Sequence, residues 1–445
     1  MTIQSSNISN VRRRRFQILK YASKVMLGMG VVMTTGTIIS YYLLKRWILK
    51  QRDDMIQLQR MQQQISGRFE QTGHDTSHTV RELVPVLEMI LDKHGLDLDH
   101  LLQTLKNKSK LKPDERVVEE EDHMPSKVEL WEDLKLKSLV KLVTTIYTSS
   151  TLYLLLTIQL NILARRDYLE TAINEAIEKE SVNGSISIDG VYQWIKGKCW
   201  GIGDTSTSNI GETKQMGRDK ITYINEQGFL SMSWWLLNRG WEQYYHLVEN
   251  IVSVELNDLT VRDKITKQEF EQRLRRVFTD INKMLSGQND EKEPIIVLEE
   301  VMLPDESMEA YTLQQTLDDE SMALLYDDKN RALISQLLSE TRTYVNMNSS
   351  HDVMDAMIKR SMDTAINAIN ANIDIKSKRP VQEQNTVDSG NTSKTYPVAM
   401  FTLAVKDYCS QLLTSNDTIN VTMDSMAHTK ELEEFASGVY CNFEI

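Results

Sequence analysis

The residues with the clearest chemical potential lie at the start of a long apolar stretch, residues 126–170. Lys127, Trp131 and Leu134 are four and three positions apart, so a helix would place them on one face. A cation, a large aromatic and an aliphatic side chain suit recognition of another protein, because Trp is strongly enriched at interaction hot spots. Trp131 is also compatible with an ordinary core anchor, and these residues alone leave both interpretations open.

Signatures of catalysis are missing from the sequence. It contains no paired Cys–His nucleophile, no HExxH, no phosphate loop and no dinucleotide fingerprint. GIGDTS at residues 201–206 lacks the Gly-Lys-Ser/Thr element and a preceding strand, so a flexible insertion is the better interpretation. His74 and His78 have the spacing of two ligands on one helix face, but a usable metal site needs three or four ligands. The sequence therefore predicts a protein that is not an enzyme and has no cofactor or metal site.

The element that would position the Trp-containing face is a predicted helix over residues 126–170, which contain no Pro or Gly. Ser126 followed three positions later by Glu129 is a capping box, in which each side chain accepts a hydrogen bond from the other residue's backbone N–H. Pro125 stops the helix from extending backwards. At ~1.5 Å per residue the helix would be about 65 Å long. Its buried stripe is predicted to contain Leu139, Leu142, Val143 and Ile146.

The second half of this helix is apolar on nearly every side beyond Leu152, so it must be enclosed. Residues 142–164 carry no charge over 23 positions, which raises the alternative of a membrane span. Several Thr and Ser residues, with Gln159 and Asn161, favour a central helix buried by neighbouring helices instead.

A second predicted helix precedes this one. Residues 78–105 are predicted to form two helical segments with a break near Gly95, and the second segment carries a stripe of leucines. Residues 106–125 form a charged linker, first basic and then acidic. If the leucine helix packs beside the start of the 126–170 helix, the two become the walls of a groove. The stripe consists of Leu98, Leu101, Leu102 and Leu105.

Composition favours helices throughout the 445 residues. Gly and Pro together make up about 6% of the chain, half the usual ~12%. The fold class predicted is therefore all-α: a bundle of long helices around one central buried helix, with a single N-terminal transmembrane helix. Three widely separated cysteines, Cys199, Cys409 and Cys441, indicate a reducing compartment.

The N-terminus differs from the rest of the chain. Residues 25–44 run for 20 positions without a charge, enough to cross a ~30 Å hydrocarbon core. Residues 1–50 hold nine Lys/Arg and no acid, and subtracting these nine from the net charge of −12 leaves −21 for the remainder. A basic N-terminal segment on an otherwise acidic chain indicates that the N-terminal end lies at a membrane, and it does not indicate a nucleic-acid partner. The basic block ahead of the span consists of Arg12, Arg13, Arg14 and Arg15.

Aromatic residues mark the far end of the span, where Tyr41, Tyr42 and Trp47 would form an aromatic belt. Two alternatives to a membrane span fit this N-terminus less well. A cleaved signal peptide would have a shorter apolar run and a small-residue cleavage site. A mitochondrial presequence would not contain a full span.

Charge alone does not settle the orientation of the span. The positive-inside rule leans towards a cytosolic N-terminus, but bases flank both ends. The predicted organisation is a basic tail (1–24), a transmembrane helix (25–44) and a helical domain (45–445) with loops near 106–125, 181–220 and 376–395.

Other segments of the domain follow the same helical pattern. Residues 261–285 predict an amphipathic helix, residues 307–375 are helical, and a final helix covers 397–414. The β-branched run IIVLEEVMLP, 295–304, could form a short strand. Residues 234–245 hold a dense aromatic set whose members should mostly be core.

Several short motifs together resemble the peroxin-3 family of peroxisomal membrane proteins, most closely its fungal branch. They are the RRRR block with the apolar stretch after it, KVELWEDLK (127–135), TIQLNILARRDYL (157–169), VMLPDE (301–306) and LLSETR (337–342). The resemblance runs in order from about residue 12 to the end of the chain.

This resemblance implies a docking receptor for peroxin-19, a soluble chaperone that carries newly made peroxisomal membrane proteins. The family binds an amphipathic helix of that chaperone in a groove. The matching groove positions are Lys127, Trp131, Leu134 and Leu105, with Leu102 as an alternative for Leu105. A further apolar contact of the family falls on Asp167 here, which is a departure from the pattern.

The resemblance also implies a location. The large domain would face the cytosol and the N-terminal tail would face the peroxisomal matrix. This orientation is opposite to the one that the positive-inside rule favours. The four-arginine block and the span would together be the targeting signal. Passage through the endoplasmic reticulum stays open. An alternative or additional role is that of a tether or adaptor for organelle-inheritance or autophagy (pexophagy) factors, and Trp47 with its basic neighbours is a candidate contact for membrane lipids.

Overall fold

The computed structural model divides into two units, Met1–Arg68 and Phe69–Ile445. In the first unit, residues 59–68 are helical. The second unit contains nearly all the described structure. The described residues are 45–46, 55–56, 59–110, 125–181, 212–286, 296–377, 394–414 and 420–442.

Predictions for the N-terminus fall on residues that this structure does not describe. The basic tail and the transmembrane helix, residues 1–44, lie outside the described residues. Their targeting role therefore stays a prediction. The same holds for each residue of the predicted targeting block, Arg12, Arg13, Arg14 and Arg15.

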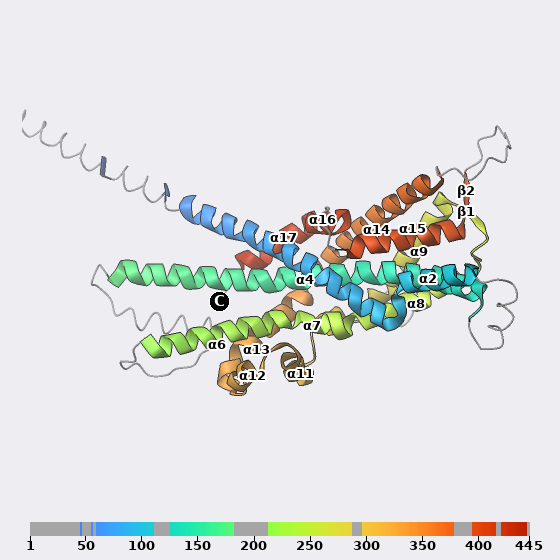
Figure 1. Ribbon diagram of the computed structural model, residues 1–445. Coiled ribbons are helices and arrows are strands. Elements are labelled where there is room, and N and C mark those ends of the chain that lie inside the picture. Colours follow the sequence, from blue (N-terminus) through green and yellow to red (C-terminus); the bar gives the residue numbers. More distant parts are fainter. Residues whose placement is uncertain are drawn as a thin grey trace, which may run out of the picture. The chain divides into compact units, whose positions relative to one another are not determined.

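The second unit is built from helices, which confirms the predicted all-α fold (Figure 1). Its described helices are residues 69–91, the π-helix η1 (Asp92–Leu96), α2 (Leu98–Lys110), α4 (Lys127–Ser181), α6 (Glu212–Ser231), α7 (Ser233–Trp235), the π-helix η2 (Leu236–Gly240), α8 (Trp241–Glu255), α9 (Lys267–Leu285), α10 (Leu298–Met302), α11 (Glu306–Thr316), α12 (Asp319–Leu325), α13 (Asp328–Val345), α14 (Asn348–Ser377), α15 (Val398–Leu413), α16 (Val421–Ala427) and α17 (Lys430–Cys441).

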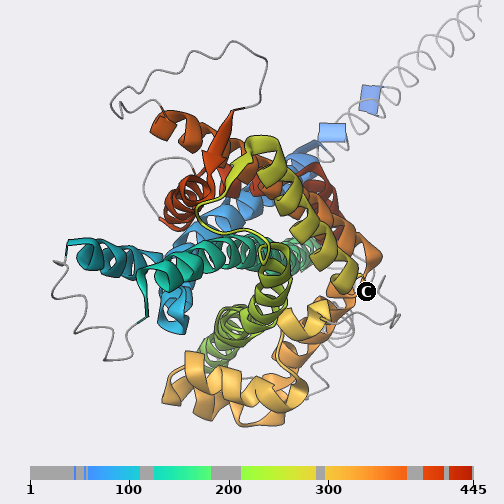
Figure 2. The same ribbon diagram turned by 90° about the vertical axis from the view of Figure 1, so that its right-hand side faces the viewer.

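Helix α4 is the centre of this unit, as predicted, and extends further than expected, to Ser181. Helices α2, α8, α14, α15 and α17 all pack against it, and Figures 1 and 2 show it running through the bundle. Among the described residues it is the one helix long and apolar enough to cross a membrane, but its most apolar window is completely buried inside the protein. The interpretation as a core helix, rather than a second span, therefore fits the structure.

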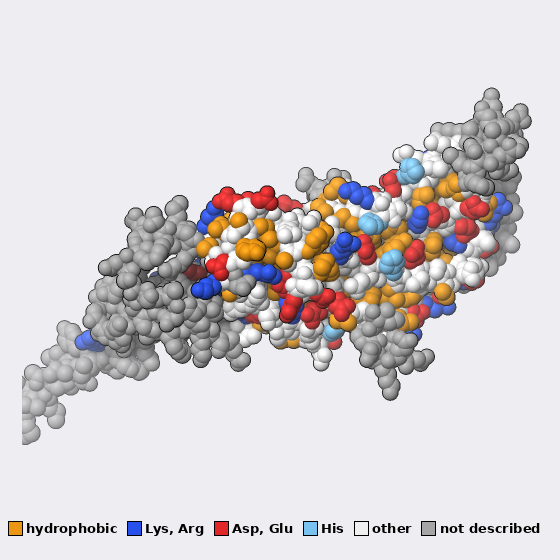
Figure 3. Space-filling model, turned by 90° about the horizontal axis from the view of Figure 1, so that it is seen from below, with side chains coloured by type: hydrophobic (Ala, Val, Ile, Leu, Met, Phe, Trp, Pro, Cys, Tyr) orange, Lys and Arg blue, Asp and Glu red, His pale blue; other side chains and the backbone are white. Residues whose placement is uncertain are grey.

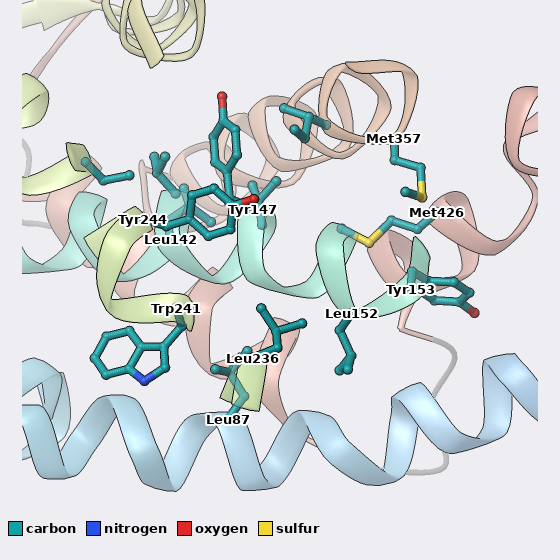
Figure 4. Close-up of a cluster of buried hydrophobic side chains, with 14 of the residues drawn as sticks. Leu87, Leu142, Tyr147, Leu152, Tyr153, Leu236, Trp241, Tyr244, Met357 and Met426 are labelled. Carbon is teal, nitrogen blue, oxygen red and sulfur yellow. The ribbon is translucent and has the colours of Figure 1, made fainter. Parts of the chain in front are cut away.

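The middle of α4 is enclosed by large side chains from several helices, as Figure 4 shows. Several buried polar groups there are paired with one another. The Tyr147 hydroxyl donates to Asn282 Oδ1 at 2.5 Å, and Thr151 and Tyr244 share a hydrogen bond of 2.9 Å. Such pairing removes the cost of burying an unsatisfied hydroxyl. Side chains that fill the space around them include Leu87, Leu142, Leu152, Leu236, Trp241, Met357 and Met426.

The far end of α4 is held to the C-terminal part of the chain by Arg165, which is largely buried. One guanidinium nitrogen donates to the backbone oxygens of Val439 and Asn442 at 3.1 and 2.9 Å, and the other pairs with Glu340 of α13. The Phe69 ring lies 5.8 Å from that of Tyr440 in α17. The chain thus enters this unit at the same end at which α4, α13 and α17 are clamped together.

Several local predictions are confirmed. The helix break falls at Gly95, whose φ of 89° lies in the left-handed region that glycine tolerates. Helix α9 buries the predicted stripe of an amphipathic helix. The three predicted loops, 106–125, 181–220 and 376–395, are shorter than expected, because α2 continues to Lys110, α6 begins at Glu212 and α14 continues to Ser377. Most of the remaining residues of these loops lie outside the described residues.

Three expectations need correction. The run 295–304 does not form a strand in its described part, where α10 is a helical turn, so tertiary packing overrides its β propensity. The segment after residue 414 contains two further helices, α16 and α17. A short antiparallel ribbon pairs β1 (Lys264–Thr266) with β2 (Thr395–Pro397), and β2 begins where a loop was predicted.

Gly240, at the end of η2, permits a very close backbone approach. A Cβ built on it would lie 2.0 Å from the backbone oxygen of Val301 in α10. The Gly240→Ala protein should therefore lose at least about 2 kcal/mol of stability, in the upper range of overpacking costs. Gly438 in α17 is the matched control, because no atom lies within 4 Å of its added Cβ, and Gly438→Ala should be neutral or stabilising. Denaturant unfolding of the full chain in detergent measures both, and equal stabilities would contradict this packing.

Candidate functional site

The first turn of α4 is fixed to its surroundings by local hydrogen bonds. Glu129 N–H donates to Ser126 Oγ at 3.2 Å, and Ser126 N–H donates to Glu129 Oε2 at 2.8 Å, which confirms the predicted capping box. The Lys108 ammonium, near the end of α2, donates to the backbone oxygen of Pro125 at 2.7 Å. Helix α2 also packs against α4. The expected pairing of the leucine helix with the start of α4 is therefore present.

The next turn of α4 is held on another side by the segment between α8 and β1. The Glu132 carboxylate accepts a hydrogen bond of 3.1 Å from the backbone N–H of Val261 and pairs with Lys135 at 2.5 Å. Lys135 is buried, and its ammonium donates to the backbone oxygens of Leu256 and Leu259. A cation on the carbonyls that follow α8 stabilises the end of that helix. The start of α4 is thus anchored by neighbours from two parts of the chain.

The structure gives the predicted site residues different environments. Lys127 is exposed and Trp131 is half-buried against the core. Leu134 and Leu105 are buried, with 0% and 2% of their surface exposed, so in this conformation they lie beneath the site and not on its surface. Leu102 on α2 is half-buried. Trp131 is therefore neither a fully enclosed core anchor nor a free surface residue.

Val128 is a candidate contact that was not predicted from the sequence. It lies in the first turn of α4, beside Lys127, and 59% of its surface is exposed. An apolar side chain between two charged ones at a helix start is the signal that could have found it. The anchoring role of Glu132 and Lys135 was also missed, because their partners lie more than a hundred positions away in the sequence.

Asp167, which takes the place of a family contact, is not near Trp131. Both residues belong to the continuous helix α4. They are separated by about ten turns, which corresponds to about 54 Å of helix. Asp167 is exposed and lies two positions after Arg165, which joins α4 to the C-terminal part of the chain. The structure therefore does not bring this position together with the other predicted site residues.

The start of α4 is thus a firmly anchored helix end that carries a half-buried Trp. The family profile described as Peroxin-3 matches residues 23–124 and 114–442, so the chain belongs to the peroxin-3 family. This membership confirms the resemblance seen in the sequence motifs.

Individual relatives align with this chain over most of their lengths. Peroxisomal biogenesis factor 3 of Saccharomyces cerevisiae is 31% identical over 451 residues, covering 98% of this chain and 97% of the relative. The protein of the same name in Kluyveromyces lactis is 32% identical, covering 91% and 93%. Peroxisomal membrane protein PEX3 of Komagataella phaffii is 27% identical, covering 86% and 89%. Membership places the chain among non-enzymatic peroxisomal biogenesis factors, with a location at the peroxisomal membrane.

The different burial of Trp131 and Leu134 gives a direct test of their roles. Leu134→Ala should lose about 2–5 kcal/mol of stability, because it leaves a cavity in the core. Trp131→Ala should cost less than the ~3–5 kcal/mol that is typical of a fully buried Trp, because part of the ring already contacts solvent. Denaturant unfolding followed by circular dichroism compares the two. If the Trp131 variant fails to fold, Trp131 is a core anchor and the binding interpretation is wrong.

Proposed function

We propose that this chain is the membrane-anchored docking receptor for peroxin-19 carrying newly made peroxisomal membrane proteins. The observation that carries the proposal is the half-buried Trp131, which keeps part of its surface exposed on the anchored first turns of α4. A large aromatic that keeps contact with solvent at the end of an otherwise buried helix is the residue type expected at the centre of a binding site. Family membership supports a role in peroxisome biogenesis.

The arrangement suits a helix docked in a groove. An amphipathic helix presents apolar anchors on one face, and these need apolar partners on two walls. Trp131 and Val128 supply the wall on α4, and Leu102 supplies the wall on α2. Leu134 and Leu105 form the floor beneath them. Lys127 at the rim would favour a partner with a carboxylate beside its apolar anchors.

Rigidity of these walls contributes to binding. The capping box, the Lys108 contact to Pro125 and the Glu132 contact to Val261 fix the first turns of α4 before any partner arrives. A preorganised site loses little conformational entropy on binding. Truncation of a hot-spot residue costs ~2–4 kcal/mol. Release of cargo then requires no chemical step, only a competing or weaker-binding state.

Titration of a peptide from the N-terminal part of peroxin-19 into the full chain in detergent tests this site. Trp131→Ala should weaken binding at least tenfold, or ~1.4 kcal/mol, in a variant that stays folded with unchanged helicity. Val421→Ala is the control, because this residue is 64% exposed on α16 and belongs to neither wall. If Trp131→Ala leaves the affinity unchanged, the groove has been assigned to the wrong residues. A wild-type chain that does not bind the peptide would refute the docking function itself.

We also propose a topology in which residues 25–44 cross the peroxisomal membrane once, residues 1–24 face the matrix and the domain from residue 45 faces the cytosol. The 20-residue uncharged run between basic flanks supports a single span. Completely buried apolar faces of α4 support a domain that stays outside the lipid.

The basic block and the span together would be the targeting signal. Four consecutive arginines beside an uncharged run combine an electrostatic and a hydrophobic contact with a membrane. A transient location in the endoplasmic reticulum is compatible with this topology. The four positions concerned are Arg12, Arg13, Arg14 and Arg15.

Protease treatment of intact peroxisomes measures the topology. A tag at the C-terminus should be removed and a tag at the N-terminus protected, because only the former is on the cytosolic side. Detergent should expose both tags and serves as the control. Removal of the N-terminal tag before detergent is added would reverse the proposed orientation.

A further inference from the structure

Two lysines from the interior of the protein reach the segment that connects the helix of residues 69–91 to α2. At the surface, acidic and basic side chains are intermixed, as the face in Figure 3 shows. Lys141 of α4 and Lys406 of α15 differ from these, because only 6% and 12% of their side chains are exposed. A lysine is almost never buried unless it is paired. Each of the two lysines therefore depends on a carboxylate partner.

The partners lie on the two sides of the helix break at Gly95. The Lys141 ammonium donates to Asp92 Oδ1 at 2.6 Å, three positions before Gly95. The Lys406 ammonium pairs with Asp99, four positions after Gly95, in the first turn of α2. These two ion pairs, Lys141–Asp92 and Lys406–Asp99, are named the hinge pairs. They join both sides of the break to two different core helices, α4 and α15.

The hinge pairs belong to one charged cluster. Burial raises the pKa of the half-buried Glu88, Lys141 counteracts this rise, and the carboxylates of both hinge pairs add to it. The buried Cys409 thiol lies near the lysines of both pairs. Burial raises the pKa of Cys409 to about 12, and both ammonium charges act against that rise. The break, α4 and α15 therefore meet at one place in the interior.

Helix α2 needs a constraint of this kind, because its apolar contacts do not fix its direction. Gly95 has a φ of 89° and Asp97 is extended, so the chain turns sharply just before the helix begins. Leu98 and Leu105 of α2 are buried, and they lie two turns apart on one side. Hydrophobic contact is non-directional, so one such row allows a helix to roll or slide along its neighbour. A charge-assisted hydrogen bond is directional and fixes one arrangement.

We infer that the hinge pairs hold α2 in place as a wall of the docking groove, which makes Lys141 and Lys406 positioning residues for the partner helix. The inference rests on the proposed function and deepens it, because Leu102 of α2 supplies one wall and Leu105 part of the floor. A shift of α2 moves both leucines relative to Trp131. The two lysines act without touching the partner, because they raise the fraction of molecules whose groove is aligned.

Substitution of the lysines by Met tests this inference, because Met removes the charge and keeps an apolar side chain in the interior. Asp92 and Asp99 have 34% and 66% of their side chains exposed, so water solvates them when the lysines are gone. Removal of Asp92 would instead leave Lys141 as an unpaired buried charge, which is strongly destabilising. The test protein is therefore the full chain with Lys141→Met and Lys406→Met.

Two measurements on this double variant in detergent are compared with wild type. Hydrogen exchange of the free protein should be at least tenfold faster in α2 and unchanged in α9, because the loosening is local. The affinity for the peroxin-19 N-terminal peptide should fall at least fivefold, which corresponds to a groove aligned in about a fifth of the molecules. Lys406→Arg keeps the charge and should keep both wild-type values.

Lys267→Met is the matched control. Lys267 of α9 pairs with Asp374 of α14 at 2.6 Å, the same length as the Lys141–Asp92 pair, and belongs to neither wall of the groove. Its loss should leave the exchange of α2 and the peptide affinity unchanged. Lys406→Met alone keeps the buried Lys141–Asp92 pair, so it carries the test if the double variant fails to fold. It should weaken peptide binding two- to threefold.

Two results would overturn the inference. Unchanged exchange in α2 of the Met variants would mean that the hinge pairs do not hold this helix. Faster exchange in α2 with an unchanged peptide affinity would mean that α2 is not a wall of the groove, while the docking function itself would stand. A wild-type chain that does not bind the peptide would refute the docking function, and the exchange measurement would then decide by itself whether the hinge pairs hold α2.

Discussion

The enclosure of α4 is the constraint on which the rest of this structure depends. Its most apolar window is completely buried, so helices from many parts of the chain must pack around it. The hydroxyls of Tyr147 and Thr151 on this helix are hydrogen-bonded to Asn282 and Tyr244, which come from separate helices. A helix of this kind in isolation would insert into a membrane or aggregate. Its burial turns it into a rigid axis for the whole unit.

The two ends of this helix are anchored by different neighbours. At one end, hydrogen bonds from Lys108 and Lys135 hold the turn that carries Trp131. At the other end, Arg165 joins α4 to α13 and α17 beside the entry of the chain at Phe69. The two anchored ends are separated by most of the length of α4.

Sequence reasoning succeeded where the determining interactions are local and failed where they are distant. The capping box at Ser126 and the break at Gly95 involve residues within a few positions of one another. The approach of Gly240 to Val301 and the anchoring of Lys135 could not be predicted, because those partners are distant in sequence. At the candidate site, Trp131 and Leu134 share one helix face by spacing, yet only Trp131 reaches the surface. Spacing determines which side of a helix a residue occupies, and the neighbouring helices determine whether that residue is exposed.

The most direct measurement is photo-crosslinking of peroxin-19 to the full chain in detergent, with a photoreactive amino acid placed at Val128. This position belongs to the proposed groove, is exposed and makes little contribution to the core. Docking at the start of α4 predicts a crosslink from position 128 to the peroxin-19 N-terminal peptide, and none when the same amino acid replaces the exposed Tyr326. A crosslink at position 326 and not at 128 would contradict the assignment of the docking site to the start of α4.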